Sequence, residues 1–71
     1  MTYQERLRGL REDNDLTQTQ IADILGIAQT TYSQYELGKR PLPIEHLLVL
    51  CKYYKVSADY VLCLPWQAVT K

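Results

Sequence analysis

The segment 17–38 restricts the possible folds more than any other part of this sequence. Thr17 and Gln20 have the spacing of a capping box, in which two side chains three residues apart hydrogen-bond each other's backbone at the start of a helix. Apolar residues then recur at helical intervals up to Gly26, which can take the left-handed conformation of a turn. A second helical stretch follows after a few residues and ends at Gly38. The sequence therefore predicts two short helices joined by a tight turn.

Three further short helices are predicted on either side of this segment. Apolar residues recur at intervals of three and four in residues 3–14, and residues 44–54 follow Pro43, which suits the first turn of a helix. Ser57 is a good cap for a fifth helix that ends before Pro65. No segment alternates apolar and polar residues for long enough to form a strand. We expect an all-α fold of five short helices, the fourth with a broad apolar stripe made of Ile44, Leu47, Leu48, Cys51 and Tyr54.

The composition of this 71-residue chain excludes several classes of protein. Its longest apolar stretch, residues 47–51, is far shorter than the roughly 20 residues that cross a bilayer, and its polar N-terminus lacks a signal-peptide core. Cys51 and Cys63 are too few for a disulfide-stapled scaffold and form no metal-ligand set, so we expect buried thiols. No nucleophile–base constellation or glycine-rich phosphate loop is present. We expect a cytoplasmic protein with no membrane partner, no enzyme activity, no cofactor, no metal and no small-molecule ligand.

The outward face of the predicted helix 28–37 consists of uncharged polar side chains: Gln29, Thr30, Thr31, Ser33 and Gln34. A solvated helix face usually mixes Glu, Lys and Arg, whereas amides and hydroxyls suit base contact. Glutamine can form paired hydrogen bonds with adenine, and threonine can contact the thymine methyl. The small Ala22 permits the close helix crossing of a helix-turn-helix, whose second helix enters the major groove of DNA. Double-stranded DNA is therefore the expected partner.

Five motifs occur in the order and at the spacing of one family. They are L-R-x-L-R at 7–11, T-Q-x-x-I-A-x-x-L-G-I at 17–27, Y-S-x-Y-E-x-G at 32–38, L-x-x-L-C at 47–51 and V-S-x-D-Y-V-L at 56–62. In these motifs, over about residues 3–64, the chain resembles the phage-repressor-like (XRE or Cro-type) helix-turn-helix DNA-binding family. The resemblance implies a compact five-helix repressor-like DNA-binding domain in residues 1–64. It further implies a sequence-specific transcriptional regulator, a repressor, that binds a palindromic operator as a homodimer.

The resemblance also assigns roles to individual residues. Base contacts fall to four residues of the polar face: Gln29, Thr30, Ser33 and Gln34. Phosphate contacts fall to five residues around it: Thr17, Gln18, Arg11, Lys39 and Arg40. Arg11 and Glu36 match a structural pair that in the family links the first helix to the end of the third. Ala28 departs from the family, which usually has a capping Ser or Thr there, and Ala is the poorer cap by about 1 kcal/mol.

Two alternatives remain open from the sequence. Eight Lys and Arg balance eight Asp and Glu, and the helix 28–37 has no basic residue. These features favour an alternative function, a protein-interaction module of the same fold (antitoxin-like or anti-repressor) that does not read DNA. The C-terminal tail, residues 65–71 with Trp66, either covers the domain's own core or forms a dimer contact.

Overall fold

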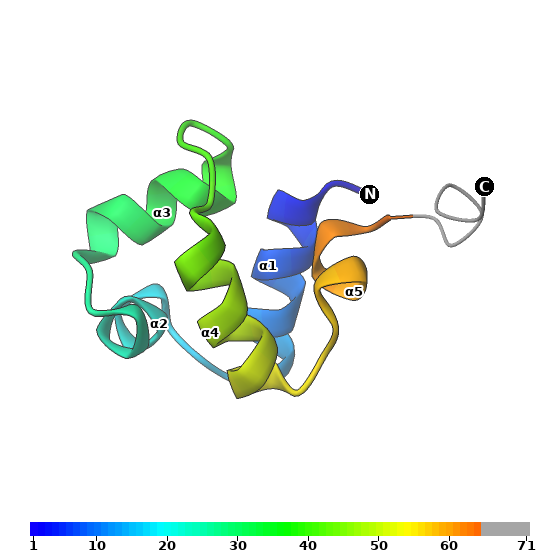
Figure 1. Ribbon diagram of the computed structural model, residues 1–71. Coiled ribbons are helices and arrows are strands. Elements are labelled where there is room, and N and C mark those ends of the chain that lie inside the picture. Colours follow the sequence, from blue (N-terminus) through cyan, green and yellow to red (C-terminus); the bar gives the residue numbers. More distant parts are fainter. Residues whose placement is uncertain (65–71) are drawn as a thin grey trace.

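The computed structural model describes residues 1–64, and all the regular secondary structure in them is helical. Five helices follow one another (Figure 1): α1 (Tyr3–Asp13), α2 (Gln18–Leu25), α3 (Gln29–Leu37), α4 (Ile44–Tyr54) and α5 (Ala58–Leu62). The predicted all-α, five-helix fold is confirmed. The third helix begins one residue later than predicted, because Ala28 has the extended backbone of a cap (φ −71°, ψ 147°). The predicted tail, residues 65–71, and its contact through Trp66 lie outside the described residues.

Local hydrogen bonds and backbone conformations set the ends of α2 and α3. The predicted capping box is confirmed, since the backbone N–H of Thr17 donates to Oε1 of Gln20 at 2.8 Å and the backbone N–H of Gln20 donates to Oγ1 of Thr17 at 3.1 Å. Gly26 ends α2 with a φ of 71°, and Gly38 ends α3 with a φ of 76°. Both values lie in the left-handed region that favours glycine.

The helices pack around one apolar core. α2 packs against α3, α1 contacts both α3 and α5, and α4 packs against α5. Figure 1 shows α2 and α3 together at one end of the molecule and α5 at the other, with α1 and α4 between them. The buried side chains come from all five helices: Leu7, Leu10, Ile21, Ala22, Tyr32, Tyr35, Leu47, Leu50 and Val61. No helix in residues 1–64 has the length and apolar character needed to cross a membrane.

The predicted apolar stripe of α4 is wrong in part. Leu47 is buried and Cys51 and Tyr54 are partly buried, but Ile44 and Leu48 are exposed. Leu50 lies in the core instead, because the side of α4 that carries Leu47 and Leu50 faces the other helices. Cys51 and Cys63 are free thiols, as expected, but both are only partly buried.

Candidate nucleic-acid interface

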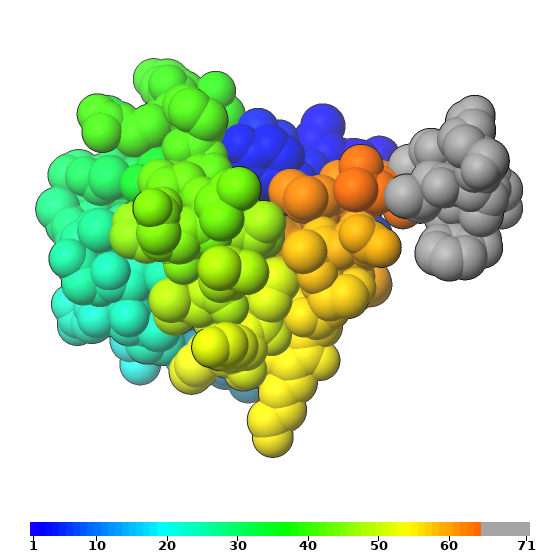
Figure 2. All heavy atoms as spheres, in the orientation of Figure 1, coloured from blue at the N-terminus to red at the C-terminus, as the bar shows by residue number. Residues whose placement is uncertain are grey.

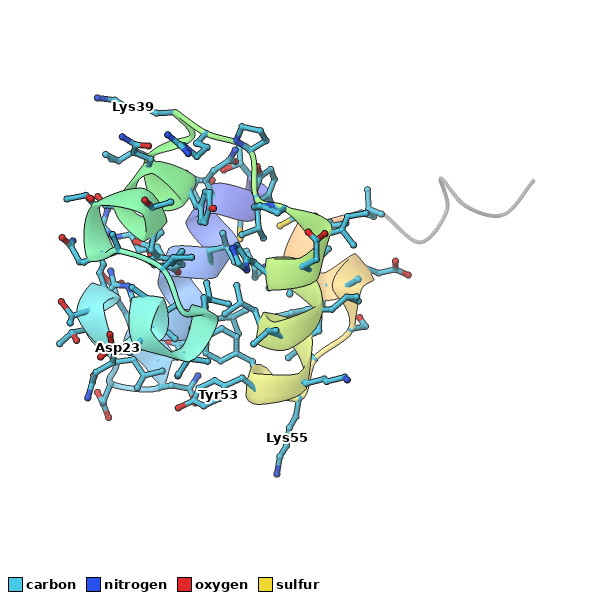
Figure 3. All side chains as sticks on the ribbon, turned by 60° about the vertical axis from the view of Figure 1, so that its left-hand side comes forward. Asp23, Lys39, Tyr53 and Lys55 are labelled. Carbon is cyan, nitrogen blue, oxygen red and sulfur yellow. The ribbon has the colours of Figure 1, made fainter. Side chains whose placement is uncertain are left out.

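The polar face of α3 lies at the surface of the molecule. Gln29 and Thr30 are exposed, and Ser33 and Gln34, one turn further along, are partly buried. Residues three and four apart share one side of a helix, so these four side chains lie on one face. Thr31 falls on another side of the helix and is partly buried. In Figure 3, polar side chains of α2 and α3 project away from the rest of the molecule.

Leu37 belongs to the same face, and the sequence interpretation missed it. It follows Ser33 by four residues and Gln34 by three, and 65% of its surface is exposed. The predicted face contained only uncharged polar side chains because it ended at Gln34. Extending the helical period by one turn identifies Leu37. An exposed methyl group at this position gives the face an apolar end.

A chain of hydrogen bonds joins this face to the interior. Nε2 of Gln29 donates to Oε1 of Gln18 at 2.7 Å, and Nε2 of Gln18 donates to Oε1 of Glu36 at 3.2 Å. Glu36 in turn accepts two bonds from the Arg11 guanidinium, from Nε to Oε2 at 2.8 Å and from Nη2 to Oε1 at 3.2 Å. The side chain of Gln29 is therefore oriented through contacts that span α1, α2 and α3.

The ion pair of Arg11 and Glu36 is largely shielded from solvent. Only 13% of the Arg11 side chain and 3% of the Glu36 side chain are exposed. Burial alone would raise the pKa of Glu36, but hydrogen bonds from Arg11 and Gln18 favour the carboxylate and hold its pKa below the ordinary value of 4.5. Nη1 of Arg11 donates to the backbone oxygen of Leu16 at 3.0 Å, so each nitrogen of the guanidinium has a partner. This bonding joins α1 to the end of α3.

Two basic residues follow the polar face in the loop between α3 and α4. Lys39 and Arg40 are both exposed, and Figure 3 shows Lys39 pointing away from the molecule. Nε of Arg40 donates to Oε1 of Gln34 at 3.0 Å, which brings a positive charge onto the edge of the face. At the other edge, the N-terminus of α2 presents backbone N–H groups beside Gln18, a geometry that suits anions. The hydroxyl of Thr17 is already used by the capping box.

The arrangement suits binding of a polyanion. Within residues 1–64, no group of three His, Cys, Asp or Glu side chains is placed to hold a metal ion. The polar face of α3 instead offers hydrogen-bond donors and acceptors, bordered by the loop Lys39–Arg40 and the α2 N-terminus. Donors and acceptors on an exposed helix, with cationic groups beside it, are the elements of major-groove recognition.

Comparisons with known proteins agree with this geometry. The family described as "Helix-turn-helix" matches residues 7–61. The uncharacterized HTH-type transcriptional regulator YobD of Bacillus subtilis is 42% identical over 60 residues, 84% of this chain and 54% of YobD. The cryptic phage CTXphi transcriptional repressor RstR of Vibrio cholerae is 36% identical over 66 residues, 93% of this chain and 58% of RstR. The antitoxin PezA of Streptococcus pneumoniae is 34% identical over 53 residues, 75% of this chain and 34% of PezA.

No solved structure matches this chain. The chain spans about half the length of YobD and of RstR and about a third of PezA. Its predicted resemblance to phage repressors is confirmed by the match to RstR. The family match covers residues 7–61, which include the two short helices joined at Gly26. The chain therefore belongs to the helix-turn-helix family.

Proposed function

We propose that this chain is a sequence-specific DNA-binding transcriptional regulator, a repressor, with α3 in the major groove. The observation that carries the proposal is the exposed amide and hydroxyl face of α3, whose glutamines are held by hydrogen bonds to Gln18 and Arg40. The names of YobD and RstR as transcriptional regulators support this assignment. A face oriented before binding loses less conformational freedom when it meets DNA.

The hydrogen bonds within the protein predict what each glutamine reads. One N–H of Gln29 is bonded to Gln18, which leaves its other N–H and its oxygen for the paired contact to adenine N7 and N6. The oxygen of Gln34 accepts from Arg40, which leaves two N–H donors for acceptors such as guanine N7 and O6 or thymine O4. Thr30 and Ser33 supply hydroxyls, and Leu37 offers an apolar contact for a thymine methyl.

Phosphate contacts would position the domain on the duplex. We assign them to the start of α2, where Thr17 and Gln18 present backbone N–H groups and the Gln18 side chain, and to Lys39 and Arg40. Arg11, which the resemblance also assigns to phosphate, has every guanidinium nitrogen bonded within the protein, so we propose no phosphate contact for it. So few contacts give weak binding by one copy, because phosphate contacts supply most of the affinity. We therefore propose a homodimer on a palindromic operator, with half-sites about 34 Å apart.

The alternative function, a protein-interaction module of antitoxin-like or anti-repressor type that does not read DNA, is supported by the net charge of zero. One relative is named an antitoxin. YobD and RstR, which are more similar to this chain over longer alignments, are named regulators, so we favour the DNA-binding function. The two functions differ in whether a random DNA pool yields an enriched sequence.

The decisive experiment is selection of bound fragments from a random duplex pool, followed by affinity measurements over a range of salt concentrations. Gln29→Ala should cost about 1–3 kcal/mol at one base position and relax the preference there. Lys39→Ala should weaken binding to all sequences alike and reduce the salt slope by about one.

Neighbouring threonines provide the matched control. Thr30→Ala removes a hydroxyl from the exposed face, whereas Thr31→Ala makes the same change on a partly buried side of α3. We expect only the Thr30 variant to alter base preference. If no sequence is enriched, or if the Gln29 and Lys39 variants bind as the parent does, the assignment of this face to DNA is wrong.

A further inference from the structure

The outward side of α4 carries apolar residues that the fold leaves uncovered. Ile44, Leu48, Val49 and Tyr53 are 69%, 54%, 39% and 45% exposed, while Leu50 on the opposite side is fully buried. Figure 2 shows the yellow-green atoms of α4 at the front surface of the molecule. Four exposed apolar side chains on one short helix are unusual for an isolated small domain, because clustered apolar surface commonly marks an interaction site.

The charges on this side of α4 form a self-complementary pattern. Glu45 and Lys52 are the two fully charged residues of α4, and both are exposed. Within residues 1–64 neither takes part in an ion pair. They are seven residues apart, about 10.5 Å along the helix axis, with Leu48 and Val49 midway between them. The positions 45, 48, 49 and 52 follow the spacing i, i+3, i+4, i+7, so the four side chains form one stripe; we call it the α4 stripe.

A second copy of this chain has the surface that matches this stripe. When two such helices meet antiparallel about a two-fold axis at Leu48 and Val49, Glu45 of each copy comes opposite Lys52 of the partner subunit. Leu48 then meets Leu48 of the partner subunit on the axis. A two-fold interface requires a patch that is complementary to itself, and an acid and a base equidistant from an apolar centre meet that requirement. Ile44 and Tyr53 flank the stripe and extend the apolar contact.

We propose that the α4 stripe is the homodimer interface of this protein, with the α4 helices of two copies packed antiparallel. The inference rests on the homodimer of the proposed function and gives it a surface within the described residues. Gln29, Thr30, Ser33 and Gln34 lie on α3 and have no part in the stripe. Dimerisation through α4 therefore uses none of the residues assigned to base reading.

The contact area predicts a reversible dimer. A contact along one helix of 11 residues is smaller than the roughly 800 Å² per partner of a standard stable interface. We expect dissociation in the micromolar range or weaker, so that protein concentration controls the fraction of dimer. Sedimentation equilibrium from about 10 µM to 1 mM covers this range.

Charge reversal tests both the surface and the antiparallel register. Glu45→Lys places two lysines opposite each other at both ends of the stripe, and Lys52→Glu places two glutamates there. Each single variant should dimerise about tenfold more weakly than the parent. An equimolar mixture of the two variants should dimerise as the parent does, because every charged contact between them is again between opposite charges. Asp13→Lys, at an exposed site on α1, is the control with the same change in net charge as Glu45→Lys and should leave dimerisation unchanged.

Three results for the parent and the charge variants would each overturn the proposal. They are a parent chain that stays monomeric at millimolar concentration, single variants that dimerise as the parent does, and a mixture no tighter than either variant alone. Circular dichroism of each variant verifies that it is folded. Loss of the dimer in Trp66→Ala with no loss in the charge variants would assign the interface to the tail and also overturn the proposal.

The proposed function is tested separately with an isolated half-site. If base preference on the half-site persists while the charge variants have no effect, only the α4 interface is wrong. If the mixture restores the dimer but no base is preferred, the interface stands and the DNA-reading function is wrong.

Discussion

Glu36 accepts the side-chain hydrogen bonds that join α1 and α2 to α3 behind the polar face. Its carboxylate is almost inaccessible to solvent, and Arg11 supplies two of its hydrogen bonds. Removing one partner of a shielded ion pair leaves the other charge uncompensated, which costs more than replacing both. The resemblance to the repressor family was needed to predict this pair, because residues 25 positions apart have no local spacing that indicates contact.

We expect Arg11→Met to lower the free energy of unfolding by about 3–5 kcal/mol, because Glu36 stays buried without its cation. The double variant Arg11→Met, Glu36→Met should recover a large part of that loss. Urea unfolding followed by circular dichroism measures both. The exposed pair of Arg8 and Glu12 is the control, since 67% and 54% of those side chains are exposed and the pair contributes little. A loss in Arg11→Met no greater than in Arg8→Met would contradict the structural role.

Acidification should destabilise the protein through Glu36. Its pKa in the folded state lies below the ordinary value of 4.5, so below that pH the unfolded chain binds more protons than the folded chain. The stabilisation is complete above about pH 4.5 and is lost as the pH falls through the folded pKa. Unfolding measured between pH 6 and pH 3 should therefore show a steeper fall for the parent than for Glu36→Gln. If the free energy of unfolding falls equally with pH in the two proteins, another carboxylate is responsible for the loss of stability in acid.

At the scale of the elements, the helix boundaries were predictable because their causes are local. Thr17 with Gln20 starts α2, and Gly26 and Gly38 provide the left-handed ends of α2 and α3. The start of α3 is the exception. Ala28 has no side-chain oxygen to accept a hydrogen bond from the first turn, so the cap of α3 has no side-chain hydrogen bond.

Ala28→Ser should therefore stabilise the fold by about 1 kcal/mol, because serine can accept a hydrogen bond from the first turn of α3. The extended backbone at this position is compatible with serine. Ser57→Ala makes the reverse change at the cap of α5, where Oγ accepts from the backbone N–H of Tyr60 at 3.1 Å, and should destabilise by a similar amount. Thermal unfolding of the two variants measures both effects. A lower midpoint for Ala28→Ser would contradict this account of the cap.

The burial of α4 was less predictable than its position. Apolar residues occur almost all round this helix, so periodicity alone leaves open whether the side with Leu47 and Leu50 or the side with Ile44 and Leu48 faces the core. Packing against α5 decides it, and that packing is tertiary. The bonds of Gln18 to Gln29 and Glu36 were unpredicted for the same reason, since they join different helices.

The net charge of the whole molecule is zero. The position of each charge, rather than the sum of the charges, therefore determines how the protein contacts DNA. Lys39 and Arg40 lie next to the polar face of α3, while Glu36, the acid on that helix, is neutralised by Arg11. Placement of this kind suits binding with a shallow salt dependence, because few phosphates are neutralised. The cytoplasmic location and the lack of enzyme activity stay predictions from the sequence.

The bonds that Gln29 and Gln34 make within the protein also determine the thermodynamics of recognition. Both amides are already partnered within the protein, and the proposed base contacts use the N–H and oxygen groups that these bonds leave free. Association would then exchange hydrogen bonds to water for hydrogen bonds to bases, with little net enthalpy gained when the base pair is correct. At a mismatched base pair, the amide loses its hydrogen bonds to water without gaining one to the base. Discrimination between bases therefore comes more from this free-energy cost than from the free energy gained at the correct base pair.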